Sequence, residues 1–496
     1  MSTPDDGLVL DDVDPGTVRC IHLVGVAGTG MGAFAGMLKA AGHEVTGSDQ
    51  NVYPPMSDML RAWGIPVLTP YAPSNLDAVK PDLVVIGNVI RRVNPEATEV
   101  RVRRLPQMSF PAALGAFFLR SRHSVVVAGT HGKTTTTALL GHVLTVAGGD
   151  PSVLVGGVAR NCDANFRLGA GSHFVVEGDE YDTAYFDKGP KFLHYRPRTA
   201  ILTSIEFDHA DIFRDLAHYE AAFERFVRLL PPDGCLAVSA AYPNVLRIAR
   251  TSTARVVTYG LARDSGRAGG GLGTDYVACD LAHDPEGARF TVLERDRALG
   301  LATLPGGGAQ NVENALGVVA AARALGLDFA DIARGLGTFA GVRRRQEVRG
   351  EVGGVTIVDD FAHHPTAVRA TIAAMKARFP GRRLWAAFEP RSNTSRRRVH
   401  QEEYVEALAG APCVVLKVPD PHDMVPADQR LDADQVVADL RARGVDARAE
   451  TDVDTLARAV ADGARPGDVV LVMSNGAFGG FIDRLLAALP HPIHHP

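Results

Sequence analysis

Residues 123–146 join an apolar run, a glycine-rich loop and a helix-forming stretch, in that order. The run HSVVVA is followed by GTHG and then by KTTTTALLGHVLTV. Backbone N–H groups of such a loop can surround phosphate oxygens, the Lys133 ammonium can neutralise phosphate charge, and the Thr134 hydroxyl can bind Mg²⁺. The usual longer glycine spacing is broken because position 127 is valine. The order of strand, loop and helix still favours a nucleotide phosphate site over a chance lysine in a glycine turn.

The composition is that of a large globular protein without a strong charge. A length of 496 residues suggests about three domains, and 46% hydrophobic residues at a mean hydropathy of +0.01 provide for several cores. A net charge of −5 offers no basic surface for nucleic acid, and no apolar run reaches the roughly 20 residues that span a bilayer. The acidic N-terminus is not a signal peptide, and the five cysteines are scattered. We therefore expect a cytoplasmic protein without nucleic-acid or membrane partners.

Alternating strand-like and helix-like stretches divide the chain into three α/β blocks. We place these blocks at residues 18–121, 122–340 and 341–496. Strands that alternate with helices predict a parallel wound sheet, which binds ligands at the carboxyl ends of its strands. In the middle block, the segment 264–275 is too rich in glycine for the interior of a helix or strand, so we expect a mobile surface loop there.

A second glycine cluster follows the first strand of the first block. Its members crowd a strand-to-helix turn and are Gly25, Gly28, Gly30 and Gly32. Glycines let the backbone approach a ligand closely, and the helix N-terminus offers N–H groups to phosphate. The spacing departs from the dinucleotide pattern G-x-G-x-x-G, although Asp49 lies about where a ribose-binding acid would. The cluster favours a diphosphate site without requiring a nicotinamide cofactor, and a purely structural turn is the alternative.

Acidic and histidine side chains follow several strands at the ends where wound sheets bind ligands. In chain order they are Glu177, Asp179, Glu180 and Asp182; Glu206, Asp208, His209 and Asp211; and Asp359, Asp360, His363 and His364. Clustered carboxylates repel one another unless a cation relieves them, and oxygen ligands suit Mg²⁺. Arg343, Arg344 and Arg345 stand at the boundary of the last two blocks. Such a run is usually a solvated face, but a guanidinium there could also stabilise a transferring phosphoryl group.

Six segments, taken together, resemble the Mur ligase family: GTHGKTTTT, EGDEYD, EFDH, NVENAL, VRRRQE and DDFAHHPT. The resemblance covers nearly the whole chain and implies an ATP-dependent ligase that adds amino acids or peptides to UDP-N-acetylmuramic acid. It also implies three domains: a Rossmann-like UDP-sugar domain, a P-loop ATPase domain and a second Rossmann-like domain. Further segments, among them FDKGPKFLHYRP and EPRSNTSRRR, resemble the branch that attaches a whole L-alanyl-γ-D-glutamyl-meso-diaminopimelate tripeptide in peptidoglycan recycling.

The resemblance implies roles for the residues at matching positions. The catalytic set would be Lys133 on the terminal phosphate of ATP, with Glu177 and His209 holding one Mg²⁺, while Thr134 holds another. The implied ATP-binding set is Gly129, Thr130, His131, Gly132, Lys133, Thr134, Thr135, Asn311, Asn314, Arg345 and Asp360. The implied UDP-sugar set is Gly25, Gly28, Gly30, Gly32, Asp49 and Asn88, and the peptide residue is Arg391. The muramyl carboxylate would become an acyl phosphate that the peptide amine attacks, in a monomer or weak dimer.

Two positions depart from the family pattern. Gln310 stands where histidine is usual, and Phe223 stands where some branches carry a carbamylated lysine beside the second metal. The second departure is typical of the branch that contains the L-alanine and tripeptide ligases. A ligase for free L-alanine is therefore the first alternative. An NAD-linked oxidoreductase and a regulatory nucleotide-binding module are alternatives of another class. The first would require the glycine loop at 25–32 to bind NAD and leaves the Lys133 loop without a purpose, and the second predicts ATP binding without turnover.

Overall fold

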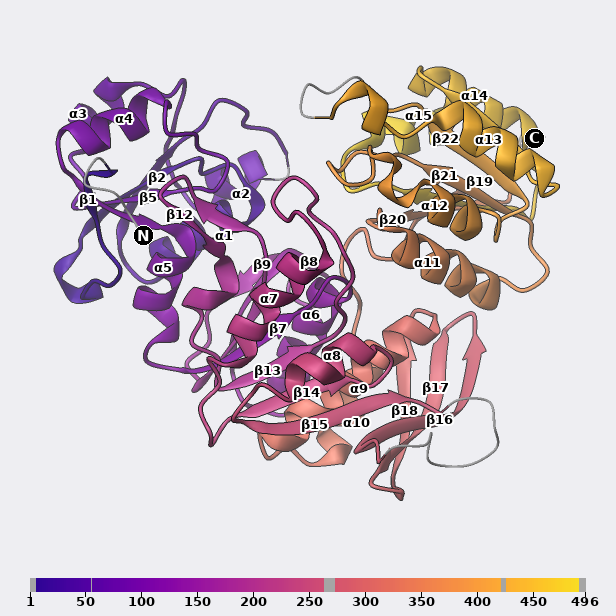
Figure 1. The fold of residues 1–496 in the computed structure, drawn as a ribbon, viewed down its shortest axis with the longest axis horizontal. Helices are drawn as coiled ribbons and strands as arrows, with labels where there is room; N and C mark the ends of the chain where they lie inside the picture. Colours follow the sequence, from indigo (N-terminus) through magenta and orange to yellow (C-terminus); the bar gives the residue numbers. More distant parts are fainter. Residues whose placement is uncertain (1–5, 55, 263–272, 421–424, 490–496) are drawn as a thin grey trace, which may run out of the picture.

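The computed structural model describes residues 6–54, 56–262, 273–420 and 425–489, which form three α/β lobes (Figure 1). The first lobe contains a parallel sheet in the order β1-β6-β5-β2-β3-β4. Its strands are β1 (Leu8–Val9), β2 (Cys20–Val24), β3 (Glu44–Ser48), β4 (Val67–Leu68), β5 (Leu83–Ile86) and β6 (Pro106–Ser109). Its helices are η2 (Pro15–Thr17), α1 (Thr29–Ala40), α2 (Met56–Ala62), α3 (Pro73–Val79), α4 (Pro95–Val102), α5 (Phe110–Leu114) and η3 (Gly115–Leu119).

The second lobe is built on a ten-stranded sheet in the order β18-β17-β16-β15-β14-β13-β7-β10-β8-β9. Its strands are β7 (His123–Ala128), β8 (Ser152–Ala159), β9 (Ala164–Arg167), β10 (His173–Gly178), β13 (Thr199–Leu202), β14 (Cys235–Ser239), β15 (Arg255–Leu261), β16 (Tyr276–Asp284), β17 (Gly287–Glu294) and β18 (Arg297–Pro305). Its helices are η4 (Lys191–His194), α6 (Lys133–Val146), α7 (Leu216–Val227), α8 (Pro243–Ala249), α9 (Ala309–Ala324) and α10 (Phe329–Gly337). A separate hairpin of β11 (Asp182–Ala184) and β12 (Asp187–Pro190) precedes η4.

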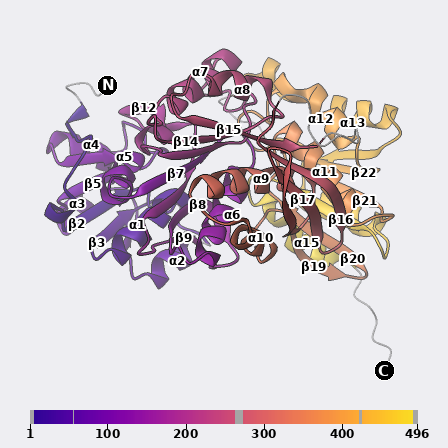
Figure 2. The same cartoon turned by 90° about the horizontal axis from the view of Figure 1, so that it is seen from below.

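The second lobe has helices on both faces of its sheet, α7 and α8 on one and α6, α9 and α10 on the other (Figure 2). Strand β7 is apolar from Val125 to Ala128 because both of its faces are covered there. Val125 and Val127 belong to the cluster that includes α6 and α9. Val126 and Ala128 belong to a cluster that includes α7 and extends into α1 of the first lobe. The first two lobes therefore share a continuous hydrophobic core.

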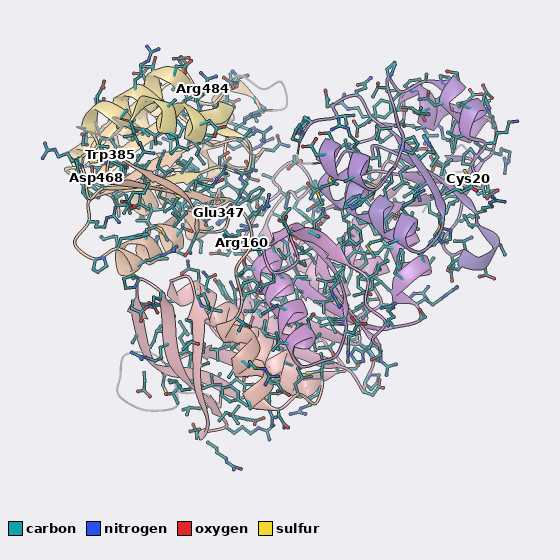
Figure 3. The ribbon with its side chains drawn as sticks, turned by 180° about the vertical axis from the view of Figure 1, so that it is seen from behind. Cys20, Arg160, Glu347, Trp385, Asp468 and Arg484 are labelled. Atoms are coloured by element: carbon teal, nitrogen blue, oxygen red, sulfur yellow. The ribbon has the colours of Figure 1, made fainter. Side chains whose placement is uncertain are left out.

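The third lobe contains a six-stranded sheet in the order β19-β20-β24-β21-β22-β23. Its strands are β19 (Glu347–Val352), β20 (Val355–Asp360), β21 (Leu384–Phe388), β22 (Cys413–Lys417), β23 (Asp446–Glu450) and β24 (Val469–Met473). Its helices are α11 (Pro365–Arg378), η5 (Arg398–His400), α12 (Gln401–Leu408), η6 (Ala427–Gln429), α13 (Ala433–Ala442), α14 (Val453–Gly463), η7 (Phe478–Gly480) and α15 (Phe481–Ala488). In its core the Trp385 indole donates to Asp468 Oδ2 at 3.1 Å (Figure 3).

The α/β fold class is confirmed, with three corrections to strand direction. The wound part of the central sheet is parallel, but β16, β17 and β18 pair antiparallel, as do β8 with β9 and β19 with β20. Most of the glycine-rich segment 264–275 lies outside the described residues. Among the residues that the structure describes, no helix is both long and apolar enough to cross a membrane.

Candidate active site

The glycine-rich loop lies between the carboxyl end of β7 and the first residue of α6. Gly129 has a φ of +133° and Gly132 a φ of +80°, conformations that favour glycine. A Cβ on Gly129 would lie 2.8 Å from the Ser204 carbonyl oxygen, and one on Gly132 would collide with the Asn314 amide. Both glycines are therefore required by backbone conformation and by close packing, and the loop leaves the N-terminus of α6 free to face a phosphate.

Lys133, the first residue of α6, is held by the loop and by a buried acid. Its Nζ donates to the Gly129 carbonyl at 2.6 Å and to Glu180 Oε2 at 2.9 Å. The Glu180 side chain is only 1% exposed, accepts from the Tyr219 hydroxyl at 2.8 Å and lies 3.5 Å from His209 Nε2. Glu180 thus stands between two cationic groups. The sequence shows Glu180 only as one member of an acidic cluster, and Tyr219 carries no sequence signal at all.

Thr134 and Glu177, both predicted to bind metal, lie in direct contact. The Thr134 hydroxyl donates to Glu177 Oε1 at 2.8 Å, and the Gly156 N–H donates to Oε2 at 2.6 Å. Arg345 Nη2 reaches the same Thr134 hydroxyl at 3.2 Å from the boundary with the third lobe. A hydroxyl and a carboxylate are the hard oxygen donors that Mg²⁺ prefers, so these residues fit the predicted ion.

The charges of this site reinforce one another. Burial opposes the charge of Lys133, but the Glu180 and Asp179 carboxylates outweigh it and raise the pKa of the ammonium. Burial would also keep Glu180 neutral, yet Lys133 and His209 hold its pKa at about 2. His209 is likewise penalised by burial, but its bond to Glu180 and the charge of Asp208 raise its pKa to about 9. At neutral pH the metal-free site therefore holds a carboxylate between an ammonium and an imidazolium.

The third predicted metal residue, His209, has neighbours other than Glu177. Its ring lies 3.5 Å from Glu180 Oε1 and 5.1 Å from the Tyr181 ring, centroid to centroid. The pKa of Glu177 is raised, first by burial and then by the charge of Asp179. The structure therefore pairs Thr134 with Glu177 and His209 with Glu180. A metal bound by Glu177 and His209 must displace the proton from the imidazole.

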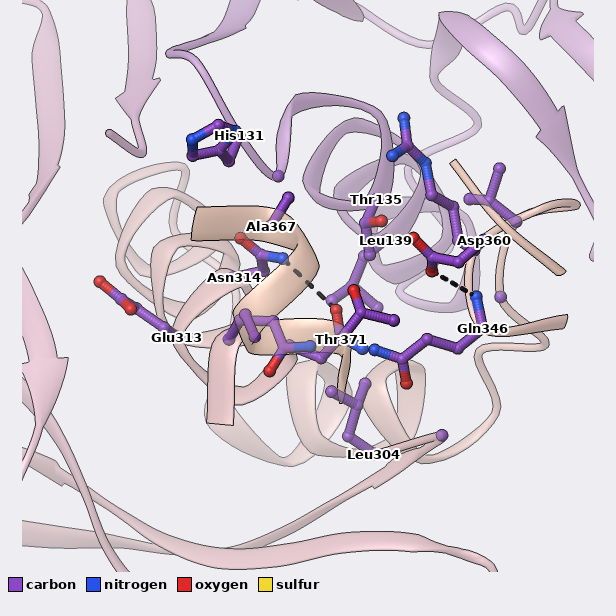
Figure 4. Close-up of a pocket in the computed structure, with 18 of the residues that line it drawn as sticks. His131, Thr135, Leu139, Leu304, Glu313, Asn314, Gln346, Asp360, Ala367 and Thr371 are labelled. Atoms are coloured by element: carbon purple, nitrogen blue, oxygen red, sulfur yellow. Dashed lines mark hydrogen bonds between the residues drawn. The ribbon is translucent and has the colours of Figure 1, made fainter. Parts of the chain in front are cut away.

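A cavity of about 380 Å³ lies where the second and third lobes meet (Figure 4). Seven residues of the predicted ATP-binding set line it: His131, Gly132, Thr135, Asn311, Asn314, Arg345 and Asp360. Asp360 Oδ2 accepts from the Gln346 N–H at 2.8 Å, which fixes the carboxylate at the cavity wall. Tyr242, which no motif indicates, also lines the cavity, and so does Glu313 of the NVENAL segment, to which the resemblance assigned no role. The volume falls within the range of about 300–1,000 Å³ typical of small-molecule sites.

The two lobes also touch through histidines and an acid beside the glycine-rich loop. His131 Nε2 lies 2.7 Å from Glu206 Oε2, and the Thr366 hydroxyl donates to Glu206 Oε1 at 3.0 Å. The His364 ring packs 4.6 Å from that of His131, centroid to centroid. Burial, aided by the nearby His131, lowers the pKa of His364 to about 3. The remaining loop residue of the predicted set, Thr130, donates to the Glu206 carbonyl at 3.0 Å.

The predicted sugar residues gather at the carboxyl edge of the first sheet. Gly25, with a φ of +89°, follows β2, and Asp49 Oδ2 accepts from the Ala27 N–H at 2.9 Å, so the acid holds the turn. Gly28 caps α1 at its N-terminus, whereas the remaining two glycines of the cluster, Gly30 and Gly32, lie inside the helix. Only part of the cluster therefore forms the strand-to-helix turn.

The other two predicted binding residues of the outer lobes are exposed. Asn88 lies in the turn after β5, beside the edge of the first sheet that carries Gly25. Arg391 follows β21 in the third lobe. Its guanidinium lies over Gly476, where a Cβ would collide with it. Arg391 is thus an exposed residue placed beside the loop that follows β24.

The fold and this arrangement define an ATP-using ligase, and comparison with known proteins gives the family. Three family models match in chain order: the Mur ligase family catalytic domain over residues 20–122, the Mur ligase middle domain over 127–322, and the Mur ligase glutamate ligase domain over 344–476. The chain belongs to the Mur ligase family of ATP-dependent enzymes that form amide bonds.

Individual relatives are similar over almost the whole chain. The UDP-N-acetylmuramate–L-alanyl-γ-D-glutamyl-meso-2,6-diaminoheptandioate ligase of Escherichia coli K12 is 41% identical over 95% of this chain and 98% of its own. The UDP-N-acetylmuramate–L-alanine ligase of Salinibacter ruber is 37% identical over 81% of this chain and 80% of its own. A crystal structure of a murein peptide ligase from Psychrobacter arcticus matches with a TM-score of 0.69 at 34% identity, covering 94% of this chain and 98% of that one.

Proposed function

We propose that this protein uses ATP to join the L-alanyl-γ-D-glutamyl-meso-diaminopimelate tripeptide to UDP-N-acetylmuramate. The observation that carries the proposal is the 41% identity to the Escherichia coli ligase named for that reaction, over 95% of the chain. The L-alanine ligase from Salinibacter ruber matches less of the chain at lower identity, so free L-alanine is the second candidate. Family membership leaves no support for an NAD-linked oxidoreductase or for a module that binds nucleotide without turnover.

The proposed reaction uses the geometry of the second lobe. ATP would lie in the cavity between Asn311 and Arg345, with its phosphates at the N-terminus of α6. Lys133 is already charged and would offset the charge on the terminal phosphate as a point charge. One Mg²⁺ would be held by Thr134 and a second by Glu177 and His209, and the two ions would neutralise charge on the phosphate and on the substrate carboxylate. The product of the first step would be the acyl phosphate of the muramyl carboxylate, which the tripeptide amine attacks.

The two outer lobes would bring the remaining substrates. In this proposal the UDP-sugar lies at the edge of the first sheet formed by Gly25, Gly28, Asp49 and Asn88, and Arg391 pairs with a peptide carboxylate. The same proposal includes a cytoplasmic location and a monomeric or weakly dimeric state. It also includes the three domain bounds 18–121, 122–340 and 341–496.

The test is phosphate release from ATP and Mg²⁺ in the presence of UDP-N-acetylmuramate, with either the tripeptide or free L-alanine as the second substrate. We expect release with the tripeptide alone. Release with L-alanine alone would move the protein to the other branch while keeping the fold and the site. Absence of release with both would refute the substrate assignment.

A further inference from the structure

The segment 182–194 leaves the second lobe and packs against the first. Ala184 and Phe186 are buried in a hydrophobic cluster that also contains residues of β2 and β5. The Ser109 hydroxyl, at the end of β6, donates to Asp187 Oδ2 at 3.0 Å. This hairpin is therefore anchored in the lobe that is proposed to carry the sugar substrate.

The same segment returns directly to the acidic strand end of the active site. The Lys191 N–H donates to the Tyr181 carbonyl at 3.3 Å, and the Phe192 N–H donates to the Asp179 carbonyl at 3.2 Å. Lys191 Nζ donates to Asp179 Oδ2 at 3.0 Å and lies 4.1 Å from the centre of the Tyr181 ring. Lys191 is only 7% exposed. Backbone and side-chain bonds at Lys191 and Phe192, directly after the hairpin, thus attach segment 182–194 to the loop that follows β10.

The carboxylates of that loop indicate a role for the positive charge of Lys191. Glu177, Asp179 and Glu180 place three carboxylates within four residues, and Glu180 is already paired with Lys133. Lys191 is paired with Asp179, whose side chain is 19% exposed. If Lys191 lost its charge, Asp179 would remain as a largely buried carboxylate without its partner. It would repel an incoming anionic substrate as well as its acidic neighbours.

We propose that Lys191 is a positioning residue for the carboxylate of the sugar substrate and that it acts through Asp179. It cancels the charge of that acid and fixes the loop to a hairpin seated in the first lobe. The inference rests on the proposed function only in that the substrate is a UDP-sugar with a free carboxylate. It is independent of which amino acid or peptide is added.

The experiment measures UDP-N-acetylmuramate binding by calorimetry, with Mg²⁺ and a non-hydrolysable ATP analogue present. Lys191→Met should weaken sugar binding by about 30-fold, because the Asp179 carboxylate, no longer offset by a lysine, repels the substrate carboxylate. Affinity for the ATP analogue should fall by a smaller factor than sugar affinity, because the nucleotide is also bound by cavity residues on the far side of the glycine-rich loop, away from Asp179. Lys191→Arg should restore most of the sugar affinity. The matched control is Lys188→Met on the same hairpin: Lys188 is 66% exposed and pairs with Asp182 at 3.0 Å, so its loss should have little effect.

A double variant separates charge cancellation from a simple loss of structure. Asp179→Asn combined with Lys191→Met should bind the sugar within about threefold of Asp179→Asn alone, because no carboxylate is left to cancel. Sugar binding of Lys191→Met equal to that of the wild type would overturn the proposal. An equal loss of sugar and nucleotide affinity, or a double variant as weak as Lys191→Met, would also overturn it. Wild-type protein that does not bind UDP-N-acetylmuramate would instead refute the proposed function.

Discussion

Replacement of Glu180 by glutamine should change the protonation of the active site while keeping its shape. The Glu180 carboxylate is 1% exposed and contacts Lys133 at 2.9 Å, the Tyr219 hydroxyl at 2.8 Å and His209 at 3.5 Å. Glutamine retains the size and one acceptor oxygen, so the hydrogen bond from Tyr219 can persist. What it removes is the negative charge that both cations face.

The size of the effect follows from the pKa of the carboxyl. A pKa of about 2 in place of the usual 4.5 corresponds to about 3 kcal/mol of net preference for the ionised form. Because the folded pKa is depressed, this stabilisation is fully present above about pH 4.5 and is lost as the pH falls towards 2. Glu180→Gln should therefore lower the thermal unfolding temperature at pH 7. The difference in unfolding temperature between the variant and the wild type should become smaller as the pH falls below 4.5.

His209 provides the direct readout of the same substitution. Its pKa of about 9 depends on the bond to Glu180, so in Glu180→Gln it should fall towards the usual 6.5. The assay is a histidine NMR titration of the metal-free protein, with the His209 signal assigned by its loss in His209→Gln. Tyr219→Phe is the matched control, since it removes a hydrogen bond but no charge. A His209 signal that still titrates near pH 9 in Glu180→Gln would refute the charge network of Lys133, Glu180 and His209.

Four further outcomes are expected. Lys133→Ala should reduce ligation by about 1,000-fold or more, measured as phosphate release, because phosphoryl transfer loses its point charge; near-normal turnover would contradict this role. Gly132→Ala should weaken binding of an ATP analogue in calorimetry by about tenfold or more, because its φ of +80° and the nearby Asn314 leave no room for a Cβ; unchanged affinity would count against the loop. His209→Ala should raise the Mg²⁺ concentration needed for half-maximal rate, and an unaltered Mg²⁺ dependence would remove it from the metal site. His364 has a pKa of about 3, below its usual 6.5, so the contact between the second and third lobes should weaken as the pH falls below 6.5; X-ray scattering profiles identical at pH 8 and pH 5 would contradict this.

The parts of the site that the sequence predicted are those set by local backbone chemistry. Gly129 and Gly132 are required because a strand must turn sharply into a helix, and this turn also brings Lys133 and Thr134 to the sheet edge. Glu177 was placed correctly at the end of a strand because a buried apolar run stops there. These features depend on a few neighbouring residues, so a short motif contains them.

Most of the parts that the sequence did not predict depend on contacts between distant segments. One missed feature is local: the side-chain pattern of β16, β17 and β18 is the same in either direction, but the two-residue connections 285–286 and 295–296 permit only antiparallel pairing. In the sequence Glu180 is one acid among several. Its importance becomes visible only in the fold, where Lys133 and Tyr219, which is 39 residues further along the chain, both donate hydrogen bonds to it. Tyr242 reaches the cavity from a segment without any motif.

The charges of the site connect the three lobes. Three carboxylates at the end of β10 would by themselves repel an anionic nucleotide and a carboxylate substrate. Lys133 offsets one of them from within the second lobe, and Lys191 offsets another from a hairpin that is buried in the first lobe. Arg345 adds a guanidinium at the start of the third lobe, in contact with Thr134. Each lobe therefore supplies or supports one positive charge beside the same carboxylates. Anionic substrates should bind with full affinity only when all three lobes are correctly positioned. Substrate binding would then be coupled to the arrangement of the lobes that places these charges around the reacting groups.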